Sequence, residues 1–380
     1  MKVLALDCET TTFNKGDPFD ERNLFVLGGY GDALSFSKFL PNDISGLESA
    51  LHEKTLVILF NGKFDLHWCN NIGIHFNVRQ PIWDCQLAEF ILSNQRWKYP
   101  SLDEACEKRG IGKKIDTIKL KYWNNNIDTD MIPPAELEEY LQQDVSLTYK
   151  LYLAQLAEFK KPEHASKYKL FRLGCYDLLV LQEMEYNGYL FDKENAIAEA
   201  TRLEGICADL DNNLLSFFPD IPVNVGSPSH ISTILYGGTI KDTVRIPIGE
   251  YKTGAKVGHT RYKLLEQEYK LPRLITPLKG TELAKEGFYS TDEDTMKNLK
   301  PTGKVKKIID LLLERRGLEK LRSTYYNGIP DLIEKHHWKD NFVHGSLNQC
   351  VAITSRLTGT KPNQQNMPKG CKQFCISRYE

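Results

Sequence analysis

The chain has 380 residues, of which 41% are hydrophobic and 26% are charged. This composition excludes a disordered or collagen-like chain, and no apolar run reaches the roughly 18 to 20 residues that a membrane span needs. With 49 Lys and Arg against 50 Asp and Glu, the formal net charge is −1, so a surface for nucleic acid would need local segregation of charge.

The start of the chain and its cysteines indicate a reduced, intracellular protein. The apolar stretch that begins at Met1 is interrupted at Asp7, which makes it too short for a secretory signal. The nine cysteines are odd in number and include no C-x-x-C pair. This argues against a disulfide framework and against a tetrahedral zinc site. We therefore expect a cytoplasmic location.

The first 160 or so residues alternate segments that are typical of strands and of helices. Strands are expected at Val3–Cys8, Leu24–Tyr30 and Thr55–Phe60, and helices at Phe64–Asn70, Asp84–Leu92, Leu102–Lys108 and Pro134–Phe159. The last of these helices follows a Pro-Pro pair and carries acidic residues in its first turns, as helix starts often do. Strands that alternate with helices predict an α/β domain.

The rest of the chain has a different character. Long helices are expected at Leu170–Met184, Lys193–Phe217 and Val305–Tyr326, which predicts a mainly α region. Residues 246–288 are rich in Gly and Lys with little periodicity, and we interpret them as a basic, flexible insertion. A polar, extended segment follows from Gly345 to Glu380.

Two groups of carboxylates are expected at strand ends of the α/β domain. Asp7 and Glu9 lie on the same face of the first strand, because side chains alternate along a strand. Two adjacent carboxylates repel each other unless a cation lies between them. Asp65 follows Asn61-Gly62 after another buried strand, where α/β sheets often place their chemistry. Alone, each group is also explained by a solvated strand end or a capping turn.

A third group lies on the long helix Pro134–Phe159. Tyr140 and Asp144 are four residues apart, which places the phenol and the carboxylate on the same face of the helix. An isolated pair of this kind is usually explained by packing and solvation. The three groups follow one another in the order D-x-E, N-x-x-F-D and Y-x-x-x-D within about 140 residues.

This order resembles the 3′–5′ exonucleases of the DEDD superfamily, in the variant that carries tyrosine in its third motif. The resemblance implies a ribonuclease H-like fold and the catalytic set Asp7, Glu9, Asp65, Tyr140 and Asp144. Asp84 also matches an aspartate that the family commonly carries after its second motif, in a structural role. The implied substrate is the 3′ end of single-stranded DNA.

Phosphodiester hydrolysis explains why such a set would be acidic. Two hard cations about 3.5–4 Å apart can stabilise both the attacking hydroxide and the leaving oxygen, and Mg²⁺ prefers oxygen ligands. By resemblance, Asp7 bridges two Mg²⁺ (or Mn²⁺) ions, Glu9 and Asp144 hold the ion that generates hydroxide, and Asp65 helps to hold the other. Tyr140 would orient the attacking water, since a pKa near 10 makes it a poor base at neutral pH.

Several later stretches resemble family A DNA polymerases. They are Glu183–Asp192, Asn224–His230, Leu312–Tyr325, and Thr354–Thr358 followed by Pro362–Pro368. The last pair resembles the T-G-R-L-S and P-N-L-Q-N-I-P motifs that open the palm, with Ser355, Thr358, Gln364 and Met367 as departures. The resemblance implies contacts to primer–template DNA from Arg316, Lys320, Thr324, Arg356, Asn363, Gln365 and Asn366.

Local charge agrees with contacts to DNA. Pro301–Arg322 contains seven basic residues against three acidic ones, and Gly345–Glu380 contains five against one. Cations suit phosphate contacts, and Asn and Gln can reach acceptors in the minor groove. Either segment alone is also explained as a solvated basic helix or a polar loop.

The polymerase resemblance is incomplete. The D-Y-S-x-x-E and H-D-E motifs that carry the palm aspartates of the family do not occur in the sequence. We therefore expect an exonuclease domain at residues 1–162, a mainly α, thumb-like region at 163–344, and the first, incomplete part of a palm at 345–380. A separate palm–fingers chain would complete the polymerase site, as in a split phage gene, and the location would then be the host cytoplasm.

Three functions remain open from the sequence. The first is the proofreading exonuclease and DNA-binding portion of a split family A replicase. The second is a free-standing 3′–5′ exonuclease acting on DNA or RNA in repair or degradation, which would not need the palm motif at 354–368. The third is a non-catalytic subunit that holds DNA, against which the intact acidic residues argue.

Overall fold

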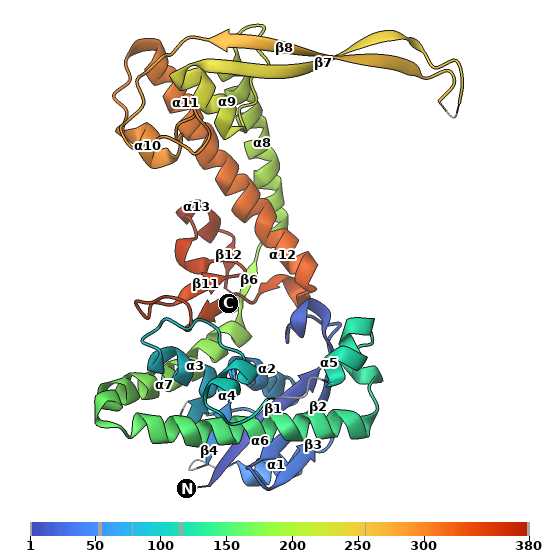
Figure 1. The fold of residues 1–380 in the computed structure, drawn as a ribbon, viewed down its shortest axis with the longest axis vertical. Coiled ribbons are helices and arrows are strands. Elements are labelled where there is room, and N and C mark those ends of the chain that lie inside the picture. Colours follow the sequence, from blue (N-terminus) through green and yellow to red (C-terminus); the bar gives the residue numbers. More distant parts are fainter. Residues whose placement is uncertain (1, 52–54, 78, 114–116, 255, 378–380) are drawn as a thin grey trace. The chain divides into compact units, whose positions relative to one another are not determined.

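The chain forms two compact units in the computed structural model, which describes residues 2–51, 55–77, 79–113, 117–254 and 256–377. Unit 1 comprises Met1–Glu194 and Gly328–Glu380, and unit 2 comprises Asn195–Asn327 (Figure 1). Each unit has a hydrophobic core of its own. The last three residues of the expected palm segment, 378–380, lie outside the described residues.

A five-stranded sheet is the centre of unit 1. Its strand order is β3-β2-β1-β4-β5, with β1 paired antiparallel to β2 and parallel to β4. The bounds are β1 Val3–Thr10, β2 Phe25–Gly31, β3 Phe36–Phe39, β4 Leu56–Leu59 and β5 Ile82–Asp84. The three predicted strands are confirmed. β3 and β5 were not predicted, because runs of three or four residues are too short to show periodicity.

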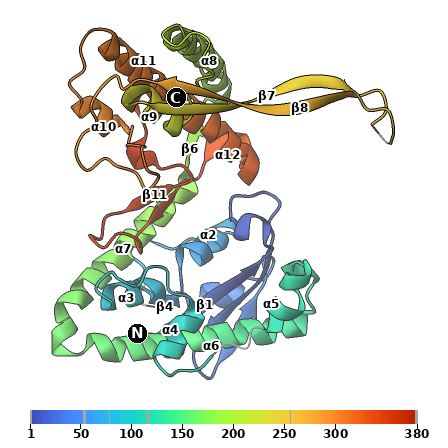
Figure 2. The ribbon, with the colours of Figure 1, turned by 45° about the horizontal axis from the view of Figure 1, so that its top comes forward.

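Helices pack around this sheet. α6 (Pro134–Phe159) runs across β1 and β2, and it buries a stripe that includes Leu137, Leu141 and Val145 (Figures 1 and 2). The other helices of this part are α1 Ser45–Ala50, α2 Lys63–Asn71, α3 Cys85–Leu92, α4 Leu102–Lys108, α5 Thr117–Lys121 and α7 Ala165–Asn187. α2, α3, α4, α6 and α7 match the predicted helices, with α4 and α6 at the predicted bounds.

The returning chain adds a second group of short elements to unit 1. β12, β6 and β9 form a three-stranded sheet in that order, and β10 pairs with β11. Their bounds are β6 Tyr189–Phe191, α12 Gly328–His336, β9 Phe342–Val343, β10 Ser346–Asn348, β11 Thr358–Thr360, α13 Lys369–Lys372 and β12 Cys375–Ile376. The segment from Gly345 is therefore less extended than its composition predicted.

Unit 2 is mainly α. Its helices are α8 Lys193–Leu215, which begins in unit 1, α9 Pro228–Tyr236, α10 Glu293–Asn298 and α11 Gly303–Lys320, continued by a π-helix at Leu321–Asn327. Ile231, Ile234, Ile308 and Leu312 are among the buried residues of its core. None of the helices in the described part of the chain is long and apolar enough to cross a bilayer.

A long antiparallel hairpin, β7 Gly238–Glu250 with β8 Thr260–Leu271, is also part of unit 2 (Figure 1). The prediction of little regular structure after residue 246 was wrong for these strands. Val244, Ile246, Ile248 and Tyr262 favour strand geometry, but the Gly and Lys residues between and around them mask the alternation.

All nine cysteines of the chain are free, and eight of them are buried. Cys8, Cys69, Cys85 and Cys106 belong to the core of unit 1. Burial raises the pKa of the Cys85 thiol well above its ordinary value, so this side chain behaves as a small apolar group.

Candidate active site

Three of the predicted acidic residues meet beside the central strand of the sheet. Asp7 and Glu9 come from β1, and Asp144 comes from α6, which crosses that strand. One carboxylate oxygen of each lies within 4.8 Å of the others. Glu9 and Asp144 are 8% and 5% exposed, so most of their surface is shielded from water. The structure thus brings together residues that are up to 137 positions apart in the sequence.

Asp65 lies next to this cluster on α2. Its Oδ1 accepts a hydrogen bond of 3.0 Å from the backbone N–H of Cys8, the residue between Asp7 and Glu9. Its side chain is 1% exposed. Burial, followed by the negative charge of Asp7, raises the pKa of Asp65 well above its ordinary value. A positive charge at this place would offset both effects.

The turn before α2 is fixed by Asp84. Asn61 has a φ of 59°, in the left-handed region that Asn tolerates better than most residues. The following backbone N–H, of Gly62, donates to Asp84 Oδ2 over 2.6 Å, and Asp84 Oδ1 accepts from Leu87 at the start of α3. A Cβ at Gly62 would lie 2.6 Å from Leu59 Cδ1. Asp84 therefore positions the turn that presents Asp65, in agreement with the structural role expected for it.

Tyr140 lies one helical turn before Asp144 and borders an open hollow of about 700 Å³. The side chain is 7% exposed, and its ring meets the ring of Trp123 edge to face at 5.8 Å between centroids. The hollow is lined by Thr12, Phe13, Lys119, Trp123, Asn124, Asn126, Ile127, Asp128 and Tyr140. Phe13 is 45% exposed, and the Arg22 guanidinium lies over its ring at 4.8 Å from the centroid.

The donor set fits hard divalent cations. It consists of carboxylate oxygens, which Mg²⁺ and Mn²⁺ prefer over softer ligands. Three of these groups converge within 4.8 Å, although like charges at this distance repel each other. The residues present are thus compatible with a metal centre at Asp7, Glu9 and Asp144, with Asp65 at its edge.

A buried polar cluster that the sequence did not reveal holds α2 in place. Lys63 and His67, on either side of Asp65, both contact Glu185 near the end of α7, at 2.5 and 3.1 Å. Lys63 Nζ also donates to the carbonyl of Leu347 over 2.6 Å, and the N–H of Leu347 donates to Glu185 Oε1 over 2.5 Å. No short sequence motif links Lys63, His67 and Glu185. The one sequence feature that could have pointed to this cluster is the presence of charged residues in otherwise apolar segments.

Two family models match the chain. The model described as 3'-5' exonuclease covers residues 1–157, and the model described as DNA polymerase family A covers residues 262–378. The chain therefore contains a 3′–5′ exonuclease segment and a segment of DNA polymerase family A. It carries a 3′–5′ exonuclease domain, and the four acidic residues and Tyr140 all lie within the part that the exonuclease model matches.

Similar proteins are DNA polymerases over most of this chain. DNA polymerase I of Synechocystis sp. is 25% identical, over 88% of this chain and 29% of its own length. DNA polymerase I of Borreliella burgdorferi is 24% identical over 97% of this chain and 35% of its own length. The DNA polymerase of Bacillus phage SP01 is 24% identical over 85% of this chain and 35% of its own length. The chain thus spans about a third of the length of these relatives.

A solved structure of the same fold is described as the POL domain of Pol1 from M. smegmatis in complex with DNA primer-template and dNTP. Its TM-score is 0.64 with 16% sequence identity, over 98% of this chain and 53% of that chain. This likeness confirms the expected mixed fold, an α/β exonuclease domain followed by a mainly α region.

The residues expected to contact DNA are divided between the two units. Arg316, Lys320 and Thr324 belong to unit 2, and Arg356, Asn363, Gln365 and Asn366 belong to unit 1. Lys320, Thr324, Arg356, Gln365 and Asn366 are exposed. Arg316 is half-buried, and its guanidinium donates to the backbone carbonyl and the hydroxyl of Thr291. Arg316 is therefore engaged within unit 2.

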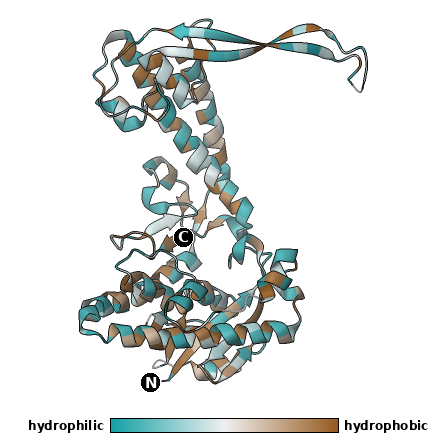
Figure 3. Ribbon diagram, viewed as in Figure 1, coloured by the Kyte–Doolittle hydropathy of each residue, from teal (hydrophilic) through white to brown (hydrophobic). Residues whose placement is uncertain are grey.

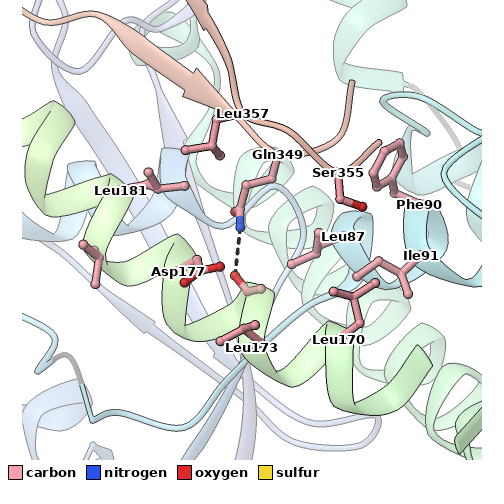
Figure 4. Close-up of a pocket in the computed structure, with 12 residues that line it drawn as sticks. Leu87, Phe90, Ile91, Leu170, Leu173, Asp177, Leu181, Gln349, Ser355 and Leu357 are labelled. Atoms are coloured by element: carbon pink, nitrogen blue, oxygen red, sulfur yellow. Dashed lines mark hydrogen bonds between the residues drawn. The ribbon is translucent and has the colours of Figure 1, made fainter. Parts of the chain in front are cut away.

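The first residues of the palm-like segment pack on the exonuclease domain. Gln349 Nε2 donates to the carbonyl of Gly174 on α7 over 3.0 Å (Figure 4). Beside this bond lies a pocket of about 340 Å³, lined mainly by apolar side chains of α3 and α7 and by Ser355 and Leu357 (Figure 4). The polymerase motif at 354–358 thus lies against the exonuclease domain within unit 1.

Proposed function

We propose that the chain hydrolyses phosphodiester bonds at the 3′ end of single-stranded DNA and releases mononucleotides, as the proofreading portion of a family A replicase. The observation that carries this proposal is the convergence of Asp7, Glu9 and Asp144 within 4.8 Å. The position of Tyr140 one turn from Asp144 and that of Asp65 beside Cys8 also support it.

The proposed cofactors are two divalent cations, Mg²⁺ or Mn²⁺. When bound, they would supply a hydroxide and stabilise the leaving oxygen. Asp7 would bridge the ions, Glu9 and Asp144 would hold one of them, and Asp65 would help to hold the other. Tyr140 would position the attacking water by a hydrogen bond. The hollow that Tyr140 borders would receive the terminal nucleotide, with its base against Phe13.

The test of this function is hydrolysis of a 5′-labelled single-stranded oligonucleotide with and without Mg²⁺. We expect Asp7→Ala to reduce turnover by several orders of magnitude, because the proposed bridging ligand is lost. Glu48→Ala, a change at an exposed acidic residue of α1, is the comparison for non-specific effects. Full activity of Asp7→Ala would refute the assignment of the site.

We further propose that a separate chain supplies the palm aspartates and the fingers. Leu173 and Val180 line the pocket of Figure 4. With Met184, one turn further along α7, they form a row of exposed apolar residues that offers a surface for such a chain. Primer–template DNA would be held by Lys320, Thr324, Arg356, Asn363, Gln365 and Asn366, and Arg316 would support the surface of unit 2.

The partner chain can be tested directly. Mixing the 380-residue protein with a chain that bears the palm and fingers should give nucleotide incorporation that neither shows alone. In that complex, Asp7→Ala should abolish proofreading while incorporation survives, because the two metal sites use different residues. Incorporation by the 380-residue protein alone would refute this part, and no affinity for any palm-bearing chain would favour the free-standing nuclease. The cytoplasm is the proposed place of action.

A further inference from the structure

The outer part of the β7–β8 hairpin, between residues 244 and 265, forms a ribbon whose described residues from 245 to 254 and from 256 to 265 are all exposed to solvent. At its base, Ile240 and Leu271 are 1% and 9% exposed and belong to the core of unit 2. From Arg245 to the end of β7, and from Thr260 to Glu268 on β8, every residue is exposed. Two-stranded ribbons without a covered face are marginally stable in water. The outer ribbon therefore adds little to the stability of unit 2.

Charge is segregated along this hairpin. Near the base, Lys241 pairs with Glu268 at 2.9 Å, and Glu266 lies 3.9 Å from the same ammonium group. Between residues 244 and 265 the sequence has one acidic residue, Glu250, against five cations, Arg245, Lys252, Lys256, Arg261 and Lys263. In the part of the chain that the structure describes, none of these five forms an ion pair. The outer ribbon thus presents a local net charge of +4.

The shape and surface of the ribbon fit a polyanion with a groove. The major groove of B-DNA, about 12 Å wide, admits a two-stranded β-ribbon, and Lys and Arg side chains neutralise phosphates on both sides of a groove. Tyr251 and Tyr262 stand among the cations, and brown and teal segments alternate along the hairpin (Figure 3). A protein partner with a mainly apolar surface would bury these five cations without anionic partners, which is energetically costly.

We propose that the outer β7–β8 ribbon binds double-stranded DNA through its phosphates, independently of sequence. This proposal rests on the proposed function, because it takes the chain to act on DNA. The ribbon holds the duplex part of a substrate, while the terminal nucleotide is held elsewhere by the exonuclease residues. Ribbon contacts therefore change affinity for duplex DNA without changing the chemical step.

The test compares two charge-matched variants of the full chain. The ribbon variant carries Lys252→Gln, Lys256→Gln and Lys263→Gln. The control carries Arg202→Gln, Lys241→Gln and Lys297→Gln, three cations of unit 2 that are each paired with a carboxylate. Binding to a fluorescent 20-base-pair blunt duplex is measured by anisotropy in EDTA over a series of salt concentrations, and a thermal melt of each variant checks that it folds.

The ribbon variant should bind the duplex at least tenfold more weakly than the control near 0.1 M salt. The plot of log affinity against log salt should become shallower. The magnitude of its slope should decrease by about 0.9 for each phosphate that the variant no longer neutralises, and so by up to about 3 for the three lysines. Equal affinities and equal slopes in the two variants would overturn the proposal. So would a weakening seen only with single-stranded DNA of the same length.

These measurements are independent of catalysis, because EDTA removes divalent cations. If the variants differ in duplex binding but the chain hydrolyses no DNA with Mg²⁺, the proposed function fails and the ribbon proposal stands. If the chain hydrolyses DNA but the variants bind the duplex equally, only the ribbon proposal fails.

Discussion

Lys63 Nζ lies 2.5 Å from Glu185 Oε1, and Lys63 stands two residues before Asp65 on α2. The same ammonium group donates to the carbonyl of Leu347 on β10, in the palm-like segment. The helix that presents an acidic residue of the candidate active site is therefore bonded to a strand of the segment that returns to unit 1 after unit 2. Disruption of this ion pair should affect both the stability of unit 1 and the position of Asp65.

Replacing Glu185 with Leu should destabilise unit 1. The side chains of Lys63 and Glu185 are 17% and 6% exposed, so the change leaves a mostly buried ammonium without its counter-charge. Removing one partner of a buried pair costs about 3–5 kcal/mol. The free energy of unfolding in urea measures the decrease, and the rate of mononucleotide release should fall with it.

The double variant Lys63→Met with Glu185→Leu is the control for this experiment. Apolar residues of similar volume often replace a buried ion pair at little cost, so the double variant should recover at least half of the missing stability. A double variant as unstable as Glu185→Leu would show that the pair itself is not the cause.

The pH dependence of stability should have a contribution from His67. Burial lowers the pKa of the His67 imidazole, so in the folded state it is neutral, donating to Glu185 and accepting from Gln182. The unfolded chain takes up the proton below pH about 6.5, while the folded chain takes it up only at a lower pH. The free energy of unfolding should therefore decrease as the pH falls from about 6.5, by up to about 1.4 kcal/mol per pH unit.

Glu185 extends this decrease to lower pH. Burial alone would raise the pKa of the Glu185 carboxyl, but the hydrogen bond from His67 and the charge of Lys63 outweigh it and lower the pKa. Its contribution is present above pH about 4.3 and is lost as the pH falls through its folded value. In urea unfolding between pH 7 and 5, His67→Gln should flatten the decrease, while His75→Gln, on an exposed residue, should not. Equal profiles would contradict this assignment.

Asp144 and Tyr140 should differ in their effects on metal binding. Mn²⁺ should raise the melting temperature of the unaltered chain, because a ligand that binds only the folded state stabilises it, by about 2.7 kcal/mol at 100 times its Kd. Asp144→Asn should reduce this rise and abolish hydrolysis. Tyr140→Phe should keep the rise and lower turnover by about 10²–10⁴-fold. A Tyr140→Phe chain that no longer responds to Mn²⁺ would place the phenol among the ligands.

Lys320 and Arg356 should contribute to the salt dependence of DNA binding more than Arg316 does. Both are exposed, whereas the guanidinium of Arg316 is bonded to Thr291. In binding to primer–template DNA, Lys320→Gln and Arg356→Gln should each flatten the log–log salt slope by about one unit. Arg316→Gln should leave the slope unchanged and lower the melting temperature instead. The opposite pattern would assign Arg316 to the DNA surface.

The local parts of the site could be predicted from the sequence. Asp7 and Glu9 lie towards the end of an apolar strand, and Asp65 follows another apolar run that ends in a turn. The spacing of Tyr140 and Asp144 places them on one helix face whatever the rest of the fold. The helix bounds of α4 and α6 were also predictable, because capping residues mark their starts: Ser101 and Glu104 form a capping box, and Pro134 begins α6.

Contacts between distant segments could not be predicted in the same way. Glu185 and Lys63 are 122 residues apart, and only the packing of α7 against α2 brings them together. Arg316 looked like a surface cation because a helical pattern does not reveal that Thr291 lies beside it. The β7–β8 hairpin was missed for a different reason: Gly and Lys residues around it obscure the short apolar alternation of Val244, Ile246 and Ile248.

The path of the chain has a consequence for folding during synthesis. Unit 2 is continuous and can fold as soon as it has left the ribosome, but unit 1 lacks its last segment until Gly328–Glu380 has been made. Lys63 and its acceptor Leu347 are separated by 284 residues, which take about 15–60 s to synthesise at about 5–20 residues per second. During that interval α2 exists without one of its two anchors, so the nascent exonuclease domain depends on a segment that is made 284 residues later.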